Sequence, residues 1–372
     1  MVTREADTWK LADFMPAGPC LPRLLDVVGR AYGVNFREVD EPSFATRLRS
    51  GWHQSVRIYE VLDGPPPTGA RAQASGASLG FVYLDLYARH SLLGRPAVRL
   101  AGAQQLCGGH AYLSMNLMEP GFGHGKLLNP EEVVAIAHEL GHAVHMLCHG
   151  GSPQEFDDLP LDVTELPSTL AETIALQPSA IAQYARHRTS GGPPPDELVR
   201  CCQRDAHFFV RYLQNASVAL GLHGEAFDAR DAAPRDLRRA AVACWQRYSP
   251  VAAHPSFTPF GEDAGLYVGQ GANHIAYLLC YMRVDALLAS KKPGAQGSSA
   301  SSSAGRAKDA RWASPDFSGR VRAQLLDRAF PGQRLATLLP PLMQGASPAQ
   351  APPPHPLPPP PADAAGLFGL AA

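Results

Sequence analysis

The chain contains 372 residues, with 33 Lys and Arg against 34 Asp and Glu, and a formal net charge of −1. This balance excludes nucleic-acid binding through bulk electrostatic attraction, because no excess of positive charge is available to neutralise phosphates. The hydrophobic fraction of 45% is enough for a sizeable core and excludes wholesale disorder. No apolar run reaches the roughly 18 residues of a membrane-spanning helix, so we expect no membrane insertion.

The N-terminal segment and the cysteines indicate an intracellular protein. Residues 1–20 carry Glu5, Asp7 and Asp13, and are therefore unlike a transit peptide or a secretory signal. The seven cysteines are an odd number and form no CxxC pair. We therefore predict reduced thiols rather than a disulfide framework.

Two strand-like runs come first along the chain. Residues 56–62 and 79–87 are rich in β-branched and aromatic side chains, and the Gly- and Pro-rich stretch 64–78 separates them. This pattern predicts a hairpin with a long tip. A third strand is predicted over 110–118. Apolar residues at helical spacing then predict helices over 131–148, 162–176, 196–222, 234–248 and 269–290. The expected fold class is mainly α, with a small β-sheet beside the helix at 131–148.

The helix at 131–148 has a strong start signal and carries an unusual polar motif. Asn129 is a good N-cap, and Glu132 completes a capping box. Within the helix, an HExxH motif lies among apolar residues, with His138 and His142 four residues apart. The two imidazoles therefore project from one face and can reach one metal ion, while Glu139 can reach a metal-bound water. The alternative is a chance occurrence of the motif.

A zinc site of this type needs a third protein ligand. The metzincin pattern requires glycine at position 145 and histidine at position 148, where this chain has His145 and Cys148, so that class is excluded. The second helix offers a carboxylate instead, because Glu165 and Glu172 share one of its faces. Glu165 is the candidate ligand, and Glu172 or Asp162 is a candidate for orienting a ligating histidine. A solvated helix face is the competing interpretation for the last two.

The two motifs together resemble the thimet oligopeptidase family of zinc metallopeptidases. The segments HELGHAVH and DVTELPSTLAE match its zinc helix and its third-ligand segment, and GFVYLDLYAR matches an upstream strand. The run from Asp13 to about Leu288 is most similar to the mitochondrial intermediate peptidase branch. The resemblance implies a zincin-type catalytic domain that holds one Zn²⁺ on His138, His142 and Glu165, with Glu139 as general base.

A C-terminal segment departs from the family pattern. The family places a histidine and two tyrosines in a Gly-rich stretch that contacts substrate. In the matching stretch, Leu266 occupies the histidine position, Gln270 occupies the first tyrosine position, and Tyr277 keeps the second. We expect Tyr277 to act as a hydrogen-bond donor in catalysis, with Gln270 or His274 on the same helix face as a second candidate donor. The competing interpretation is that His274 and Gln270 are polar surface residues without a role in catalysis.

The resemblance also predicts how the chain is divided. Residues 1–290 correspond to the C-terminal, zinc-bearing half of the family fold, and 307–345 to a further helical part of it. Residues 291–306 form a Ser- and Gly-rich insert, and 346–372 a Pro-rich tail. Because family members are about twice as long, we expect this chain to lack the other wall of their substrate channel.

The expected function is a zinc endopeptidase with peptide substrates and no nucleic-acid or membrane partner. In such an enzyme, we expect the strand at 110–118 to pair with extended substrate through main-chain hydrogen bonds. The sequence indicates no oligomeric state. The resemblance implies a mitochondrial location, with the cytoplasm as the alternative. Two other functions stay open: a peptide-binding or scaffold relative that keeps the metal site but is catalytically impaired, and a zinc hydrolase acting on other substrates.

Overall fold

A computed structural model describes most of the body of the chain. The described residues are 10–39, 53, 55–64, 66, 76–88, 101–106, 109–117, 125–149, 156–204, 206–223, 233–249, 251–254, 256–257, 273–289, 312–322 and 326. No helix in these ranges is both long and apolar enough to cross a bilayer. The predicted insert at 291–306 and the predicted tail at 346–372 lie outside the described residues, so the division at these boundaries stays a prediction.

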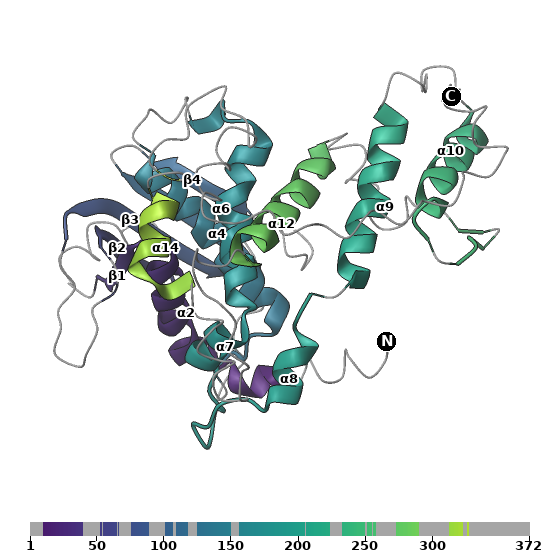
Figure 1. Cartoon of the computed structure of the whole chain (residues 1–372). Coiled ribbons are helices and arrows are strands. Elements are labelled where there is room, and N and C mark those ends of the chain that lie inside the picture. The colour runs from purple at the N-terminus through teal and green to yellow at the C-terminus, as the bar shows by residue number, and fades with distance from the viewer. Residues whose placement is uncertain are drawn as a thin grey trace, which may run out of the picture. The chain divides into compact units, whose positions relative to one another are not determined.

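The chain forms two compact units. The first takes its described residues from Met1–Gln203, Val284–Ser290 and Gly294–Gln344, and the second from Arg204–Arg283, Lys291–Pro293 and Gly345–Ala372. The first unit contains the whole β-sheet and the helix with the HExxH motif (Figure 1). This mainly helical architecture with a small sheet beside the motif confirms the predicted fold class.

The sheet has five strands in the order β1-β2-β3-β5-β4. The pair β3–β5 is parallel, and the other three pairs are antiparallel. The predicted hairpin (β2–β3) and third strand (β5) are confirmed, whereas β1 and β4 were not expected from the sequence. The strands are β1 (Val34–Glu38), β2 (Arg57–Asp63), β3 (Ser78–Tyr87), β4 (Ala101–Leu106) and β5 (His110–Leu117).

The central strands form part of the core. Val82 and Leu84 of β3 and Ala111 and Leu113 of β5 are almost wholly buried, and they alternate with other residues as one sheet face requires. Helix α4 (Pro130–Cys148) contacts β3, β4 and β5, while α2 (Ala17–Tyr32) contacts β1. The sheet therefore supports the motif-bearing helix from one side.

Helices α4 and α6 (Leu161–Ala175) match the predicted helices at 131–148 and 162–176 to within one residue. Helix α2 was not predicted, although Leu21, Leu24, Leu25 and Val28 have helical spacing and are buried. It ends at Gly33, whose φ of 65° is the left-handed conformation that favours glycine. The remaining helical elements of this unit are η1 (Ala12–Phe14), α7 (Pro178–Tyr184), α8 (Asp196–Cys201) and α14 (Pro315–Val321).

The predicted single helix over 196–222 is wrong, because the chain forms α8 and then α9 (Ala206–His223). Between them, the Gln203 side-chain amide donates a hydrogen bond to the Leu176 carbonyl at the end of α6, with an N···O distance of 2.5 Å. This bond ties the connection to a distant part of the chain. The helical periodicity continues through the break, so the local pattern did not reveal it.

The second unit is helical in its described part. Helices α9 and α10 (Pro234–Gln246) pack through a small apolar cluster that includes Val218, Ala219 and Ala241. Helix α12 (His274–Ala289) contributes its residues up to Arg283 to this unit, and its Tyr281 ring contacts that of Phe208 in α9. Helix α10 falls within the predicted 234–248; for α12, the predicted start at 269 lies outside the described residues.

The N-terminal cap of α4 gives a test of the local structure. The Asn129 Oδ1 atom accepts a hydrogen bond from the Glu132 backbone N–H at 2.8 Å, and the Glu132 carboxylate accepts one from the Asn129 N–H at 2.9 Å. Replacing Asn129 by Ala removes the first bond and should lower the free energy of unfolding by about 1 kcal/mol. Urea denaturation measures this change. Asn129→Ser, which keeps an acceptor, should retain most of the stability; equal losses in both variants would contradict the capping role.

Candidate metal centre

Helix α4 presents the two histidines of the motif from one face. The side chains of His138 and His142 are 12% and 11% exposed, although most of the helix around them is buried. One turn further on, His145 is fully buried and contacts the Phe156 ring. Burial, with smaller contributions from His142 and His149, lowers the pKa of His145 to about 3. His145 is therefore a packed, neutral residue.

The second helix, α6, lies very close to α4 at one point. A Cβ atom built on Gly141 would lie 2.7 Å from the Ser168 Cα atom and 3.0 Å from the Pro167 carbonyl oxygen. Only glycine allows this approach of the two backbones. The approach lies one residue before His142 and three residues after Glu165, so it sets the distance between the helices where the candidate ligands face one another.

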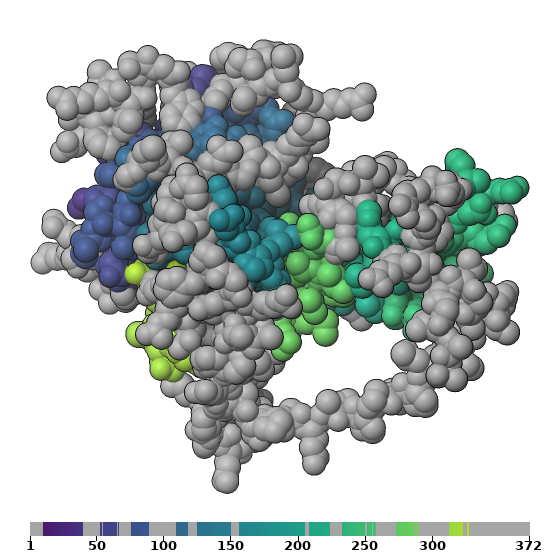
Figure 2. Space-filling model, turned by 90° about the horizontal axis from the view of Figure 1, so that it is seen from above, coloured from purple at the N-terminus to yellow at the C-terminus, as the bar shows by residue number. Residues whose placement is uncertain are grey.

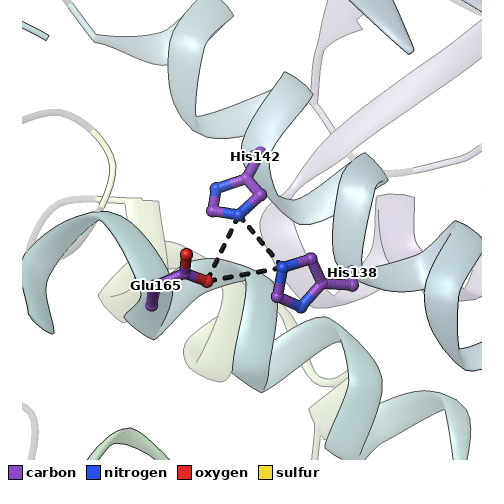
Figure 3. Close-up of side chains that lie close together, drawn as sticks. All are labelled: His138, His142 and Glu165. Atoms are coloured by element: carbon purple, nitrogen blue, oxygen red, sulfur yellow. Dashed lines mark hydrogen bonds and ion pairs between the residues drawn. The ribbon is translucent and has the colours of Figure 1, made fainter. Parts of the chain in front are cut away.

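Three candidate ligands converge at this crossing (Figure 3). The Nε2 atoms of His138 and His142 lie 3.1 Å apart, and the Glu165 Oε2 atom lies 3.4 Å from the first and 3.3 Å from the second. Two imidazole nitrogens and one carboxylate oxygen thus point at a common centre. This is the only group of three or more metal-ligating side chains in the described part of the chain.

The spacing of these atoms fits zinc. Ligands of tetrahedral zinc lie about 2.1 Å from the ion and therefore roughly 3.3–3.5 Å from one another. The three distances here are 3.1, 3.3 and 3.4 Å. Two nitrogens and one oxygen are also a usual donor set for catalytic zinc, in which the fourth position is left to water or substrate. The predicted zinc ligands are therefore brought together in a suitable geometry.

Both types of ligand are held by hydrogen bonds from α6. The Glu172 Oε1 atom lies 2.5 Å from His138 Nδ1, on the other side of the ring from Glu165. The Ser168 hydroxyl lies 2.9 Å from Glu165 Oε2. Of the two acids proposed from the sequence to orient a histidine, Glu172 is the one that contacts His138. Ser168 was missed, although its place three residues after the ligand is the usual spacing for such a contact in a helix.

The acids around His138 change its protonation behaviour. Burial by itself lowers the pKa of His138, but the hydrogen bond and charge of Glu172 and the charges of Glu165 and Glu139 outweigh it, so that the net pKa is raised. Glu139 directly follows His138 in α4 and is 2% exposed. Its role as general base stays a prediction.

The other catalytic candidates from the sequence belong to a different unit from the one that holds this centre. His274 and Tyr277 belong to the second unit, where the His274 ring is stacked on that of Tyr212 with centroids 5.3 Å apart. Their role in catalysis stays a prediction. Leu266 and Gln270 lie outside the described residues.

The centre is not sealed from solvent. The side chains of its three ligands keep between 8% and 12% exposure. Just before α6, Asp157 and Asp158 are exposed, and Figure 2 shows part of the teal stretch of the chain at the surface of the face that it presents.

A motif helix that supplies two histidines, with a second helix that supplies a glutamate, defines the zincin class of metal centre. The sequence profile of Peptidase family M3 matches residues 4–268. The chain therefore belongs to peptidase family M3, which confirms the family expected from the motifs. Among similar curated proteins, mitochondrial intermediate peptidase of Aspergillus fumigatus is 29% identical over 74% of this chain and 39% of its own length.

Two bacterial peptidases show the same relationship. Oligopeptidase A of Salmonella typhimurium is 28% identical over 58% of this chain and 31% of its own length. Dipeptidyl carboxypeptidase of Escherichia coli is 32% identical over 40% of this chain and 21% of its own length. The chain thus spans between about a fifth and two fifths of the length of these relatives.

The close approach at Gly141 predicts a large effect of a small substitution. In Gly141→Ala, the added methyl group would lie 2.7 Å from the Ser168 Cα atom, so α6 must move away. We expect a loss of about 1–3 kcal/mol in the free energy of unfolding, the usual range for overpacking, together with weaker zinc binding. Thermal unfolding and zinc titration measure the two effects. Gly18→Ala is the control, because nothing lies within 4 Å of its Cβ position. Equal behaviour of the two variants would contradict the role of Gly141.

Zinc should stabilise the folded chain, because the ligand set is assembled only when α4 and α6 are packed together. A ligand at 100 times its dissociation constant adds about 2.7 kcal/mol when it binds only the folded state. We expect the melting temperature to rise with zinc and fall again with a chelator, as measured by differential scanning fluorimetry. The variant His142→Asn should lose most of this response. A melting temperature that zinc leaves unchanged in the parent chain would contradict the site.

Proposed function

We propose that the chain is a zinc-dependent metalloendopeptidase that hydrolyses oligopeptides or N-terminal targeting peptides. The observation that carries this proposal is the convergence of His138, His142 and Glu165 at tetrahedral spacing, with the buried Glu139 next to His138 in the same helix. Membership of a peptidase family and similarity to oligopeptidase A and mitochondrial intermediate peptidase support it. The latter similarity also favours a mitochondrial location over the cytoplasm.

In the proposed mechanism, the metal acts as a Lewis acid and one carboxylate acts as a general base. Zinc on this donor set supplies a Lewis acid and lowers the pKa of its coordinated water. Glu139 accepts a proton from the attacking water and then returns it to the leaving amine, which keeps the carboxylate unchanged at the end of the cycle.

Tyr277 is the proposed donor to the oxyanion that develops on the scissile carbonyl, and His274 is a second candidate. One donor of this kind usually contributes about 10²–10³ in rate. The support is the match of Tyr277 to the second tyrosine position of the family segment. The stacking of His274 on Tyr212 favours a packing role for the histidine, so Tyr277 is the stronger candidate.

The sheet suggests where an extended peptide is held. The sequence suggested that the strand at 110–118 pairs with substrate, but β5 is paired with β3 on one side and with β4 on the other over His110–Ser114. That assignment is wrong for this segment, because its main-chain groups are already used. Strand β4 lies at the edge of the five-stranded sheet and contacts α4. We therefore propose β4 as the strand that pairs with substrate, by main-chain hydrogen bonds and with little sequence selectivity.

A second candidate function is a peptide-binding relative that keeps zinc but cleaves slowly or not at all. Leu266 and Gln270 at family substrate-contact positions favour it, because neither side chain can replace a histidine or tyrosine as a proton donor of the same kind. Stoichiometric zinc and measurable peptide binding without cleavage of a quenched peptide library would identify this function.

The general base gives the decisive test. In Glu139→Gln, the amide cannot accept the proton, so we expect peptide cleavage to fall by at least about 10²-fold while zinc content is unchanged. Metal analysis and a quenched-fluorescence peptide assay give both readouts. Glu131→Gln is the matched control, since Glu131 is exposed in the first turn of the same helix. Full cleavage by Glu139→Gln would rule out the mechanism.

A further inference from the structure

We propose that Glu172 is a positioning residue that fixes which nitrogen of His138 faces the metal. The proposal rests on the metal centre of the proposed function, but it does not depend on peptide cleavage. In this arrangement, Glu172 receives the N–H of the imidazole at Nδ1, and the lone pair of Nε2 is directed at the common centre with His142 and Glu165.

The contacts of the His138 ring support this assignment. One ring nitrogen, Nδ1, lies 2.5 Å from the Glu172 carboxylate, and the other, Nε2, lies 3.4 Å from the Glu165 carboxylate. Only the neutral imidazole can ligate a metal, and it has one N–H, so in that form the two acids compete for it. The shorter contact is the stronger hydrogen bond. The proton is therefore held by Glu172, and Nε2 is left as an acceptor.

The spacing of the two acids explains how one helix contacts both sides of a ring. Glu165 and Glu172 are seven residues apart, so they lie on the same face of α6 and about two turns, or roughly 10 Å, apart along its axis. The imidazole of His138 fits between the two carboxylates. One helix thus supplies a ligand and also the partner that orients another ligand.

The burial of Glu172 indicates that its contact with His138 compensates the cost of burying the carboxylate. Its residue is 6% exposed, and burial of a carboxylate is unfavourable unless a hydrogen-bonded partner compensates it. His138 is such a partner. Ligating histidines usually donate their second N–H to a carboxylate or carbonyl in this way, and removal of that acceptor typically weakens metal binding by about 10–100-fold.

Two substitutions at Glu172 separate charge from hydrogen bonding. Glu172→Gln keeps an oxygen that can accept the N–H but removes the charge, whereas Glu172→Leu removes both. We expect zinc affinity, measured in the full chain by competition with a chromophoric chelator, to fall about 10-fold in the Gln variant and about 100-fold in the Leu variant. Thr173→Val is the control for loss of a buried hydrogen bond in the same helix, since the Thr173 hydroxyl donates to the Thr169 carbonyl. Its affinity should stay within twofold of the parent.

A spectroscopic readout distinguishes positioning from a general loss of structure. With ¹⁵N-labelled histidine, and at an alkaline pH where the ring carries a single proton, the metal-free parent should show His138 protonated at Nδ1, with the signal assigned by its disappearance in His138→Asn. In Glu172→Leu, we expect protonation to shift to Nε2, where Glu165 is then the remaining acceptor. An unchanged tautomer in that variant, or zinc affinity in either Glu172 variant within twofold of the parent, would overturn the proposal.

These outcomes can be told apart from failure of the proposed function. If the parent binds zinc but cleaves no peptide, the peptidase function fails while the affinity series still tests Glu172. If the parent binds no zinc, the metal centre fails, and the tautomer of metal-free His138 alone decides whether Glu172 holds the ring.

Discussion

The metal centre depends on the approach of two helix backbones at Gly141. Because Gly141 has no side chain, the backbone of α6 at Pro167 and Ser168 can lie against α4. The ligands follow from this contact, since His142 is the next residue on α4 and Glu165 is less than one turn away on α6. A longer distance between the helices would leave the carboxylate short of the imidazoles, however well each helix were formed by itself.

Helix α6 is in turn held by a residue far away in the sequence. Pro167 interrupts its hydrogen bonding because it has no backbone N–H. The Tyr32 hydroxyl at the end of α2 donates a hydrogen bond to the Pro167 carbonyl, with an O···O distance of 2.5 Å. Tyr32 is fully buried, and burial is the main reason why its pKa is raised. The hydroxyl therefore stays protonated and can act as a donor. The N-terminal helix thus helps to fix the segment that carries Glu165, although it supplies no ligand.

Several features that depend on neighbouring residues could be predicted, whereas an edge strand and a helix break that involve distant partners could not. The capping box of Asn129 and the common face of His138 and His142 follow from short spacings within one helix. Strand β4 has the sequence Ala-Gly-Ala-Gln-Gln-Leu, which has little strand propensity, and it forms by pairing with β5. At the break between α8 and α9, the Gln203 side chain donates a hydrogen bond to Leu176, which is distant in the sequence. Glu165 was identified by combining helix spacing with a family motif, because no local rule joins it to the histidines.

The two units contribute different residues to the proposed function. All three candidate ligands, the proposed base Glu139 and the proposed positioning residue Glu172 belong to the first unit, and no described residue of the second unit is part of the metal-ligating group. The proposed oxyanion donor Tyr277 belongs to the second unit. Under the proposed mechanism, metal binding and turnover would therefore depend on different units of this chain. Since it spans between about a fifth and two fifths of the length of the relatives compared, a defect in cleavage with zinc still bound would point to the elements that hold substrate and oxyanion, and not to the ligands.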